Sequence, residues 1–275
     1  MNIKPSTIFF ILSCFVCILI IVSAAVGLSD PYFYYNETDE WRWQCYAQDL
    51  VNLVLVMPVL LITSLLSKKK PVVGAMLQPG VLLYLVYTYT IYCFDVHFNK
   101  FFLNYCAILA ISFYLFSYTL YKRVTATKVL DYGNKFAKPI GIYFLIIAGI
   151  FYFLWLKDIL PAIQNDIIPQ SLIQSGLVTN PVYVLDLCFV LPGLFIAGIL
   201  LLRNISFGYF LAGPFLVFTV LMDLTIAVLN SLNPQAADNS ATIITGTMLT
   251  LATFSSLLLI LLIKSRLKQA QPVFT

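Results

Sequence analysis

Four aspartates lie within or at the ends of apolar segments of this chain, where an ionisable side chain is expensive. They are Asp49, Asp95, Asp186 and Asp223. A charged residue at the centre of a bilayer costs at least about 2.5–3.5 kcal/mol, so such residues usually face a protein interior or a functional site. Carboxylates suit hard cations and protonated amines, and two that lie close together can share a proton. The first hypothesis is therefore a site for a cation, a proton or a small amine-bearing solute.

Hydroxyl and amide side chains recur near these aspartates at spacings that place them on the same side of a helix. Tyr84, Thr88, Tyr92 and Asp95 recur at intervals of four, four and three residues, so they line one face of a helix. Further polar residues follow in the next segment. The pattern predicts an outward-facing vestibule lined by Asp49, Asp95, Asp186, Asp223, Tyr84, Thr88, Tyr92, His97 and Asn104.

Each aspartate also has a purely structural interpretation. Asp49 and Asp186 fall near the start of their apolar segments, where an aspartate can cap a helix N-terminus. Asp95 can be an interfacial residue at a segment end. Asp223 fits these alternatives least, because it lies about 24 Å along its segment at a rise of 1.5 Å per residue. We therefore expect Asp223 to face the protein interior rather than lipid, within reach of at least one of Asp49, Asp95, Asp186, Tyr84, Thr88 or Tyr92.

The chain carries no strong motif for a metal, a cofactor or a nucleophile. The Asp95-x-His97 pair matches no metal-binding signature, and we find no P-loop, no dinucleotide glycine fingerprint and no G-x-S-x-G. Neither a metal nor a cofactor is predicted. Cys14 and Cys17 lie among apolar residues and are expected to pack. Cys45 and Cys93 both fall at the predicted outer face, where a disulfide between them is geometrically feasible.

The composition indicates the environment of these residues. The 275 residues are 61% hydrophobic and 10% charged, against about 45–50% and about 25% in soluble domains. This composition excludes a water-soluble fold. The net charge is only +4 and the basic residues are scattered along the chain, so a nucleic-acid partner is not suggested. The sequence predicts an all-α, polytopic transmembrane bundle in the lipid bilayer, with eight spans at about 7–28, 46–67, 72–96, 101–121, 140–163, 183–203, 207–231 and 241–264.

The basic residues predict the orientation of the spans. With the amino terminus in the cytoplasm, only Arg42, Lys100 and Lys157 fall outside, which leaves 13 of the 16 Lys and Arg residues inside. We therefore expect a multi-pass cell-membrane protein with both termini cytoplasmic. The first span, which follows Lys4 and ends in small residues, also resembles a cleavable signal peptide; the length of its apolar run favours a retained span.

Two stretches of the chain resemble each other. Both contain Y-x-x-D-L, at Tyr46–Leu50 and Tyr183–Leu187, then a mid-span proline, a basic turn and a glycine. The landmarks predict two parallel four-span repeats, at residues 1–139 and 140–275, related by an axis along the membrane normal. Proline leaves a backbone carbonyl unbonded, so the proline-containing second, third, sixth and seventh spans are expected to form the interior.

The pattern from Tyr183 to Pro192, the turn from Arg203 to Gly208, and Asp95 through Asn99-x-x-Phe102-x-x-Tyr105 resemble a group of uncharacterised multi-span bacterial inner-membrane proteins. The resemblance implies an inner-membrane location and brings no activity, substrate or site residue.

Three functions remain open from the sequence. The vestibule favours transport or binding of a cation, proton or amine, although a transporter needs polar residues in the inner half, where they are scarce. An intramembrane enzyme could use an aspartate as acid or base on a lipid or prenyl substrate, but no D-D-x-x-D pair is present. A non-catalytic membrane partner subunit would use the aspartates only structurally.

Overall fold

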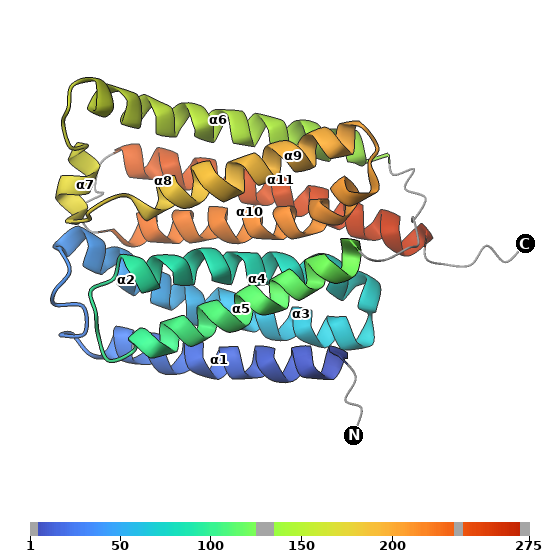
Figure 1. Ribbon diagram of the computed structural model, residues 1–275, viewed down its shortest axis with the longest axis horizontal. Helices are drawn as coiled ribbons and strands as arrows, with labels where there is room; N and C mark the ends of the chain where they lie inside the picture. Colours follow the sequence, from blue (N-terminus) through green and yellow to red (C-terminus); the bar gives the residue numbers. More distant parts are fainter. Residues whose placement is uncertain (1–4, 125–134, 234–238, 270–275) are drawn as a thin grey trace, which may run out of the picture.

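The computed structural model describes residues 5–124, 135–233 and 239–269, and these ranges fold into helices joined by short connections, with no strand (Figure 1). In chain order the helices are α1 (Pro5–Ser29), α2 (Asp39–Val51), α3 (Met57–Lys69), α4 (Pro71–Phe94), α5 (Phe102–Val124), α6 (Ala137–Gln164), α7 (Gln170–Ser175), α8 (Pro181–Leu185), α9 (Leu191–Leu202), α10 (Ser206–Leu232) and α11 (Asn239–Gln269). Two π-helical segments, η1 (Asn52–Val56) and η2 (Asp186–Val190), join α2 to α3 and α8 to α9.

Eight helical stretches in the described ranges are long and apolar enough to cross a membrane. This finding confirms the predicted all-α bundle of eight spans. The second stretch, Asp39–Lys69, begins earlier than the predicted 46–67. Its first turn carries charged residues that no hydropathy window includes, and Thr38 caps it by accepting a hydrogen bond from the Trp41 N–H at 3.3 Å.

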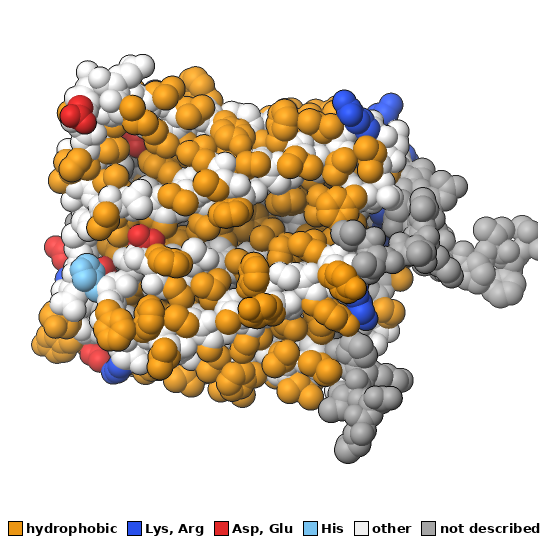
Figure 2. Space-filling model, viewed as in Figure 1, with side chains coloured by type: hydrophobic (Ala, Val, Ile, Leu, Met, Phe, Trp, Pro, Cys, Tyr) orange, Lys and Arg blue, Asp and Glu red, His pale blue; other side chains and the backbone are white. Residues whose placement is uncertain are grey.

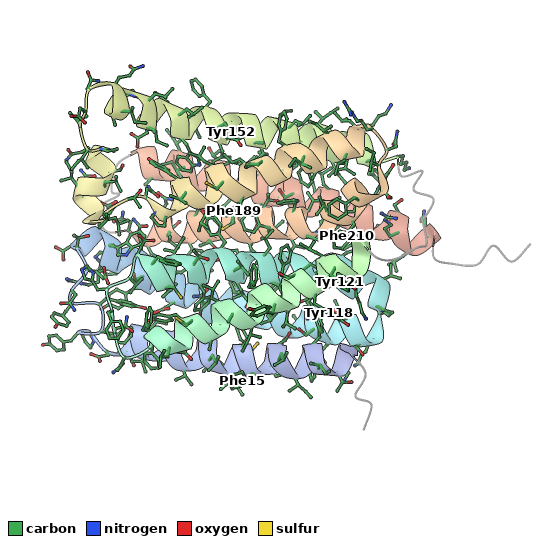
Figure 3. The ribbon with its side chains drawn as sticks, in the orientation of Figure 1. Phe15, Tyr118, Tyr121, Tyr152, Phe189 and Phe210 are labelled. Atoms are coloured by element: carbon green, nitrogen blue, oxygen red, sulfur yellow. The ribbon has the colours of Figure 1, made fainter. Side chains whose placement is uncertain are left out.

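The bundle has two distinct ends. The connections 30–38, 95–101 and 165–180 gather at one, which we call the distal end; α1 begins and α11 ends at the other, the proximal end (Figure 1). Charged side chains collect towards both ends of the face in view, with an apolar band between them (Figure 2). Within that band, aromatic side chains such as Phe15 and Phe189 are 46% and 68% exposed (Figure 3). An apolar exterior of this kind fits a lipid environment; which end faces the cytoplasm stays a prediction.

The two halves of the chain meet where α4 crosses α10 (Figure 1). Small residues allow the close approach: a Cβ at Gly213 would lie 2.9 Å from the Met76 carbonyl oxygen, and one at Gly80 would meet the backbone of Pro214. Close packing at small residues is a common way to join membrane helices. The spans of α4 and α10 are each 67% buried, as expected for interior spans.

The second and sixth spans are less buried than expected for interior spans. They are 33% and 39% buried, and the first span, which has no mid-span proline, is also 33% buried. Proline in these two spans serves a local purpose instead. Pro58 and Pro192 each follow a π-helical segment, because a proline lacks the N–H that would continue the ladder and a widened turn accommodates it.

The π-helical segments also bear on the register of the predicted repeat. Three pairs of landmarks share one offset of 134 residues: Asn52 with Asp186, Pro58 with Pro192, and Gly74 with Gly208. Asp49 and Asp186 are 137 residues apart. The landmarks thus align Asp186 with Asn52, each the first residue of a π-helical segment. The duplication itself stays a prediction.

Candidate functional site

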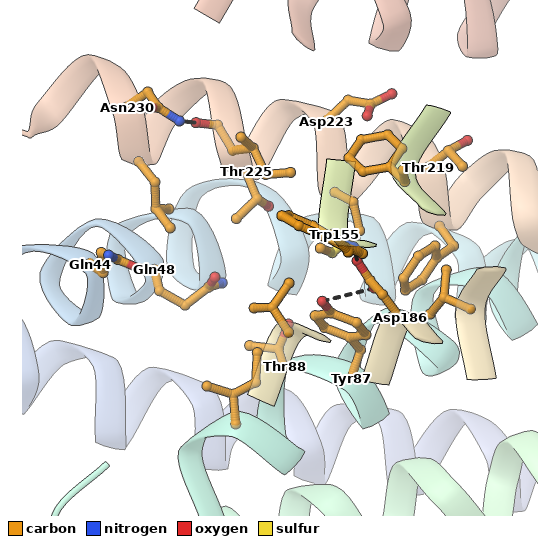
Figure 4. A pocket seen from close by; sticks show the side chains of 18 of the residues that line it. Gln44, Gln48, Tyr87, Thr88, Trp155, Asp186, Thr219, Asp223, Thr225 and Asn230 are labelled. Atoms are coloured by element: carbon orange, nitrogen blue, oxygen red, sulfur yellow. Dashed lines mark hydrogen bonds between the residues drawn. The ribbon is translucent and has the colours of Figure 1, made fainter. Parts of the chain in front are cut away.

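A pocket of about 380 Å³ lies between the two halves, walled by α2, α4, α6, the η2–α9 segment and α10 (Figure 4). Its wall combines three carboxylates with amide and hydroxyl groups: Glu40, Asp186, Asp223, Gln44, Gln48, Thr88, Thr219, Thr225 and Asn230. Aromatic rings supply much of the rest, from Trp41, Tyr87, Tyr92, Phe151, Trp155 and Phe218. The lining reaches the first turns of α2 and the last turns of α10, so the pocket lies towards the distal end.

Asp186 is a pocket carboxylate with partners for both oxygens. It begins η2, and the Tyr87 O–H donates to its Oδ1 at 3.1 Å while the Trp155 indole N–H donates to its Oδ2 at 2.9 Å (Figure 4). These donors come from α4 and α6, so Asp186 links three walls of the pocket. Its side chain is not a helix cap, because the Asn180 side chain accepts the N–H groups that open α8.

Asp223 contrasts with Asp186. It lies on α10, lines the pocket and is only 6% exposed, yet its Oδ2 has no hydrogen-bond partner among the described residues (Figure 4). It is buried, as expected, but no hydroxyl or protonated acid among the described residues donates a hydrogen bond to Oδ2. A buried oxygen without a partner costs about 1–3 kcal/mol, and more when the group is charged. Such a group in a pocket wall is a candidate counter-charge for a bound cation.

The predicted hydroxyl face of α4 contributes in part. Thr88 and Tyr92 line the pocket, whereas Tyr84 lies behind its wall. The Tyr84 hydroxyl is 2.7 Å from the Thr225 hydroxyl and accepts a hydrogen bond from the Gln48 amide at 3.0 Å. Tyr84 therefore ties together two residues that do line the pocket, on α2 and α10.

Asp49 is buried outside the pocket lining. It accepts hydrogen bonds from the Tyr34 hydroxyl at 2.7 Å and from the Tyr92 hydroxyl at 2.8 Å. Gly27 on α1 leaves room for this carboxylate, because a Cβ there would overlap Oδ2. Burial and the neighbouring carboxylate raise the pKa of Tyr34 well above its usual value, so Tyr34 remains a donor. The helix-cap interpretation is wrong for Asp49 also, since Thr38 caps α2.

The other predicted residues lie in the distal connections or at a helix contact. Asp95 follows α4, and partial burial raises its pKa to about 6. The backbone N–H and Nδ1 of His97 lie 2.7 and 2.9 Å from the Glu37 carboxylate. The Asn104 amide donates to the Leu19 carbonyl at 3.1 Å and so joins α5 to α1. The side chains of Asp95, His97 and Asn104 do not line the pocket.

Several pocket residues were missed by the sequence analysis. Tyr87 is three residues from Tyr84, but the strict four-four-three pattern passes over it. Trp155 lies at the far end of a long apolar segment and looks like an interfacial aromatic. Only the rotation of α6 against η2, which the sequence does not specify, identifies it as a donor to Asp186.

No metal or redox centre is evident in the part of the chain that the structure describes. No group of three or more His, Cys, Asp or Glu side chains there is close enough to hold a metal ion. All six cysteines are free thiols, and Cys93 lies near Cys106, with 3.9 Å between the sulfur atoms, rather than bonded to Cys45.

The chain matches no protein-family model, no curated protein and no solved structure. The pocket is therefore the feature of the molecule that bears on function.

Proposed function

We propose that this multi-pass membrane protein binds a small organic cation, such as a protonated amine, in the pocket, with Asp223 as the counter-charge. The observation that carries the proposal is the unpartnered, buried Oδ2 of Asp223 in the pocket wall. A protonated amine brings both a positive charge and hydrogen-bond donors, which are what this oxygen lacks.

The rest of the pocket suits the organic part of such a cation. A volume of about 380 Å³ is in the range of small-molecule sites. The rings of Trp41, Tyr87, Trp155 and Phe218 supply apolar area and π-faces that attract cations. Asp186 already has two donors, so its role is to orient two of these rings and to add negative potential.

The binding test uses phenyltrimethylammonium, whose charge is independent of pH, and tert-butylbenzene, its uncharged analogue of nearly the same shape. Two of the chain's three tryptophans, Trp41 and Trp155, line the pocket, so intrinsic fluorescence reports occupancy in the purified full chain. We expect saturable quenching by the cation, with an affinity at least tenfold above that for the neutral analogue.

The variant Asp223→Asn keeps the shape of the side chain and removes its charge. We expect it to weaken cation binding about 10- to 100-fold, the range expected for losing a charge-assisted interaction, and to leave binding of the neutral analogue unchanged. Asp166→Asn is the matched control, because Asp166 is exposed and outside the pocket. Equal cation affinity in Asp223→Asn and the wild type would contradict the proposal. If the wild type bound no cation at all, the result would favour the alternative that this chain is a non-catalytic partner subunit.

A further inference from the structure

A row of hydroxyl groups leads from the pocket wall into the bundle. Thr219 lines the pocket one helical turn from Asp223 on α10 (Figure 4). Its hydroxyl lies 3.0 Å from the Leu216 carbonyl and 3.3 Å from the Ser255 hydroxyl on α11. Ser255 in turn lies 2.5 Å from the Tyr143 hydroxyl on α6. The row therefore connects three helices.

The hydroxyl of Ser255 is bonded differently from its neighbours on α11. Those of Thr247, Thr250 and Thr253 each donate to the carbonyl four residues earlier in the same helix, at 2.8 Å. The hydrogen bonds found for Ser255 instead reach Thr219 and Tyr143 on other helices, and Ser255 is completely buried. A serine that only filled space in this helix would be expected to bond as its neighbours do.

The row extends the polar interior towards the proximal end. Thr219 is one turn nearer that end than Asp223, and Tyr143 is in the second turn of α6, about 9 Å from the helix start at Ala137. Such a continuation cannot be predicted from the sequence, because single hydroxyls on three different spans form no pattern along the chain.

From this row we propose that Asp223, Thr219, Ser255 and Tyr143 form a proton path, and that a bound cation and a proton compete for Asp223. The inference rests on the proposed binding function. In the empty pocket a proton neutralises the carboxylate. When a cation binds, the carboxyl O–H bond breaks, the carboxylate pairs with the cation, and one proton leaves through a solvent molecule in the pocket, which Asp223 and Thr219 both line. Each hydroxyl accepts one proton and releases another, and Tyr143, the last in the row, gives up its proton to solvent at the proximal end.

Other titratable groups face Asp223 and must be considered. Those lining the pocket from the opposite walls are Asp186, Tyr87, Tyr92, Glu40 and Cys45; Tyr143 approaches from α6, and α11 has no titratable side chain between Ala241 and Ile263. The phenols and the thiol are neutral at pH 7, and Asp186 is held by two donors. Glu40 lies in the first turn of α2 and is partly exposed, whereas Asp223 is buried. Asp223 is therefore the group whose proton the cation displaces.

The test measures protons and binding separately, with phenyltrimethylammonium as the probe. Proteoliposomes of the full chain contain a pH-sensitive dye, and the probe is added outside. We expect the wild type to give a luminal pH change on cation addition, and an affinity that falls about tenfold per pH unit once Asp223 is protonated. Tyr143→Phe and Ser255→Ala should slow the pH change at least tenfold, while the affinity from tryptophan quenching stays within twofold.

Thr250→Val is the control, because it removes an exposed hydroxyl from the same helix as Ser255 and should leave the pH change unaltered. Cation binding without a luminal pH change, or an undiminished pH change in both path variants, overturns the path and leaves the binding proposal standing. Absence of cation binding in the wild type overturns both.

Discussion

Asp49 and Asp223 are similarly buried, 2% and 6% exposed, and both lie in membrane-spanning helices. Their surroundings differ completely. Asp49 receives two phenolic hydrogen bonds, and its carboxylate has room because Gly27 carries no side chain. Asp223 lines the pocket, and its Oδ2 receives no hydrogen bond from the described residues. Burial alone therefore does not mark a site in this protein. The supply of donors separates a carboxylate that organises the fold from one that we propose binds a cation.

The largest expected effect on stability is that of removing Asp49. Asp49→Ala leaves the hydroxyls of Tyr34 and Tyr92 buried without their acceptor, so we expect a loss of about 2–5 kcal/mol. Asp223→Ala removes an unpartnered oxygen and should be neutral or stabilising. Unfolding by a denaturing detergent, followed by circular dichroism, gives both free energies. Equal losses would abolish the distinction drawn between the two aspartates.

A smaller loss of stability is expected when a methyl group fills the space beside Asp49. Gly27→Ala places a Cβ against Oδ2 of Asp49 and 3.0 Å from the Tyr34 hydroxyl, and overpacking of this kind costs about 1–3 kcal/mol. Gly149→Ala on α6 is the control, because a Cβ there meets nothing within 4 Å. In an Asp49→Ala background the cost of Gly27→Ala should fall, since the carboxylate atoms are gone and only the Tyr34 hydroxyl remains close to the added Cβ. Additive losses would show that Gly27 acts elsewhere.

The spans were predictable, whereas the partners of the aspartates were not. A membrane crossing requires about 20 apolar residues in succession, so hydropathy finds the span and the depth of Asp223 within it. The donors to Asp49 come from a connection and from the end of α4, and one donor to Asp186 comes from α6. These contacts depend on how helices rotate and cross, which no spacing within a single span specifies.

Some of the missing information was nonetheless local. Thr38 precedes Asp39 and Glu40, a typical start for a helix, and would have placed the beginning of α2 correctly. Pro58 and Pro192 indicated irregular backbone, whereas Pro79 and Pro214 lie within the continuous helices α4 and α10, which do form the interior. Glycines at the α4–α10 crossing were the better indicators, because close approach of two helices demands a small side chain.

Removing one hydrogen-bond donor to Asp186 should lower the free energy of unfolding less than removing Asp49 does. Tyr87→Phe removes one of its two donors and leaves the indole of Trp155 in place, so we expect a loss of about 1 kcal/mol. Tyr114→Phe, at a site 71% exposed, should have no effect. The same detergent titration measures both. A loss as large as that of Asp49→Ala would mean that Asp186, and not Asp49, holds the helices together.

The smallest expected effect concerns Asp95, which lies beyond the membrane-spanning part of α4. Partial burial raises its pKa from an ordinary value near 3.8 to about 6, so the folded chain holds this proton more tightly than the unfolded chain does. Its contribution to stability is therefore greatest below about pH 4 and is lost as the pH rises through about 6. Asp95→Asn should remove that dependence and leave the rest of the pH profile unchanged. Melting temperatures of the wild type and of Asp95→Asn between pH 4 and 8 give the difference in stability. If that difference does not vary with pH, Asp95 is solvated as an ordinary surface carboxylate. Burial of a carboxylate without donors would then affect stability only inside the membrane.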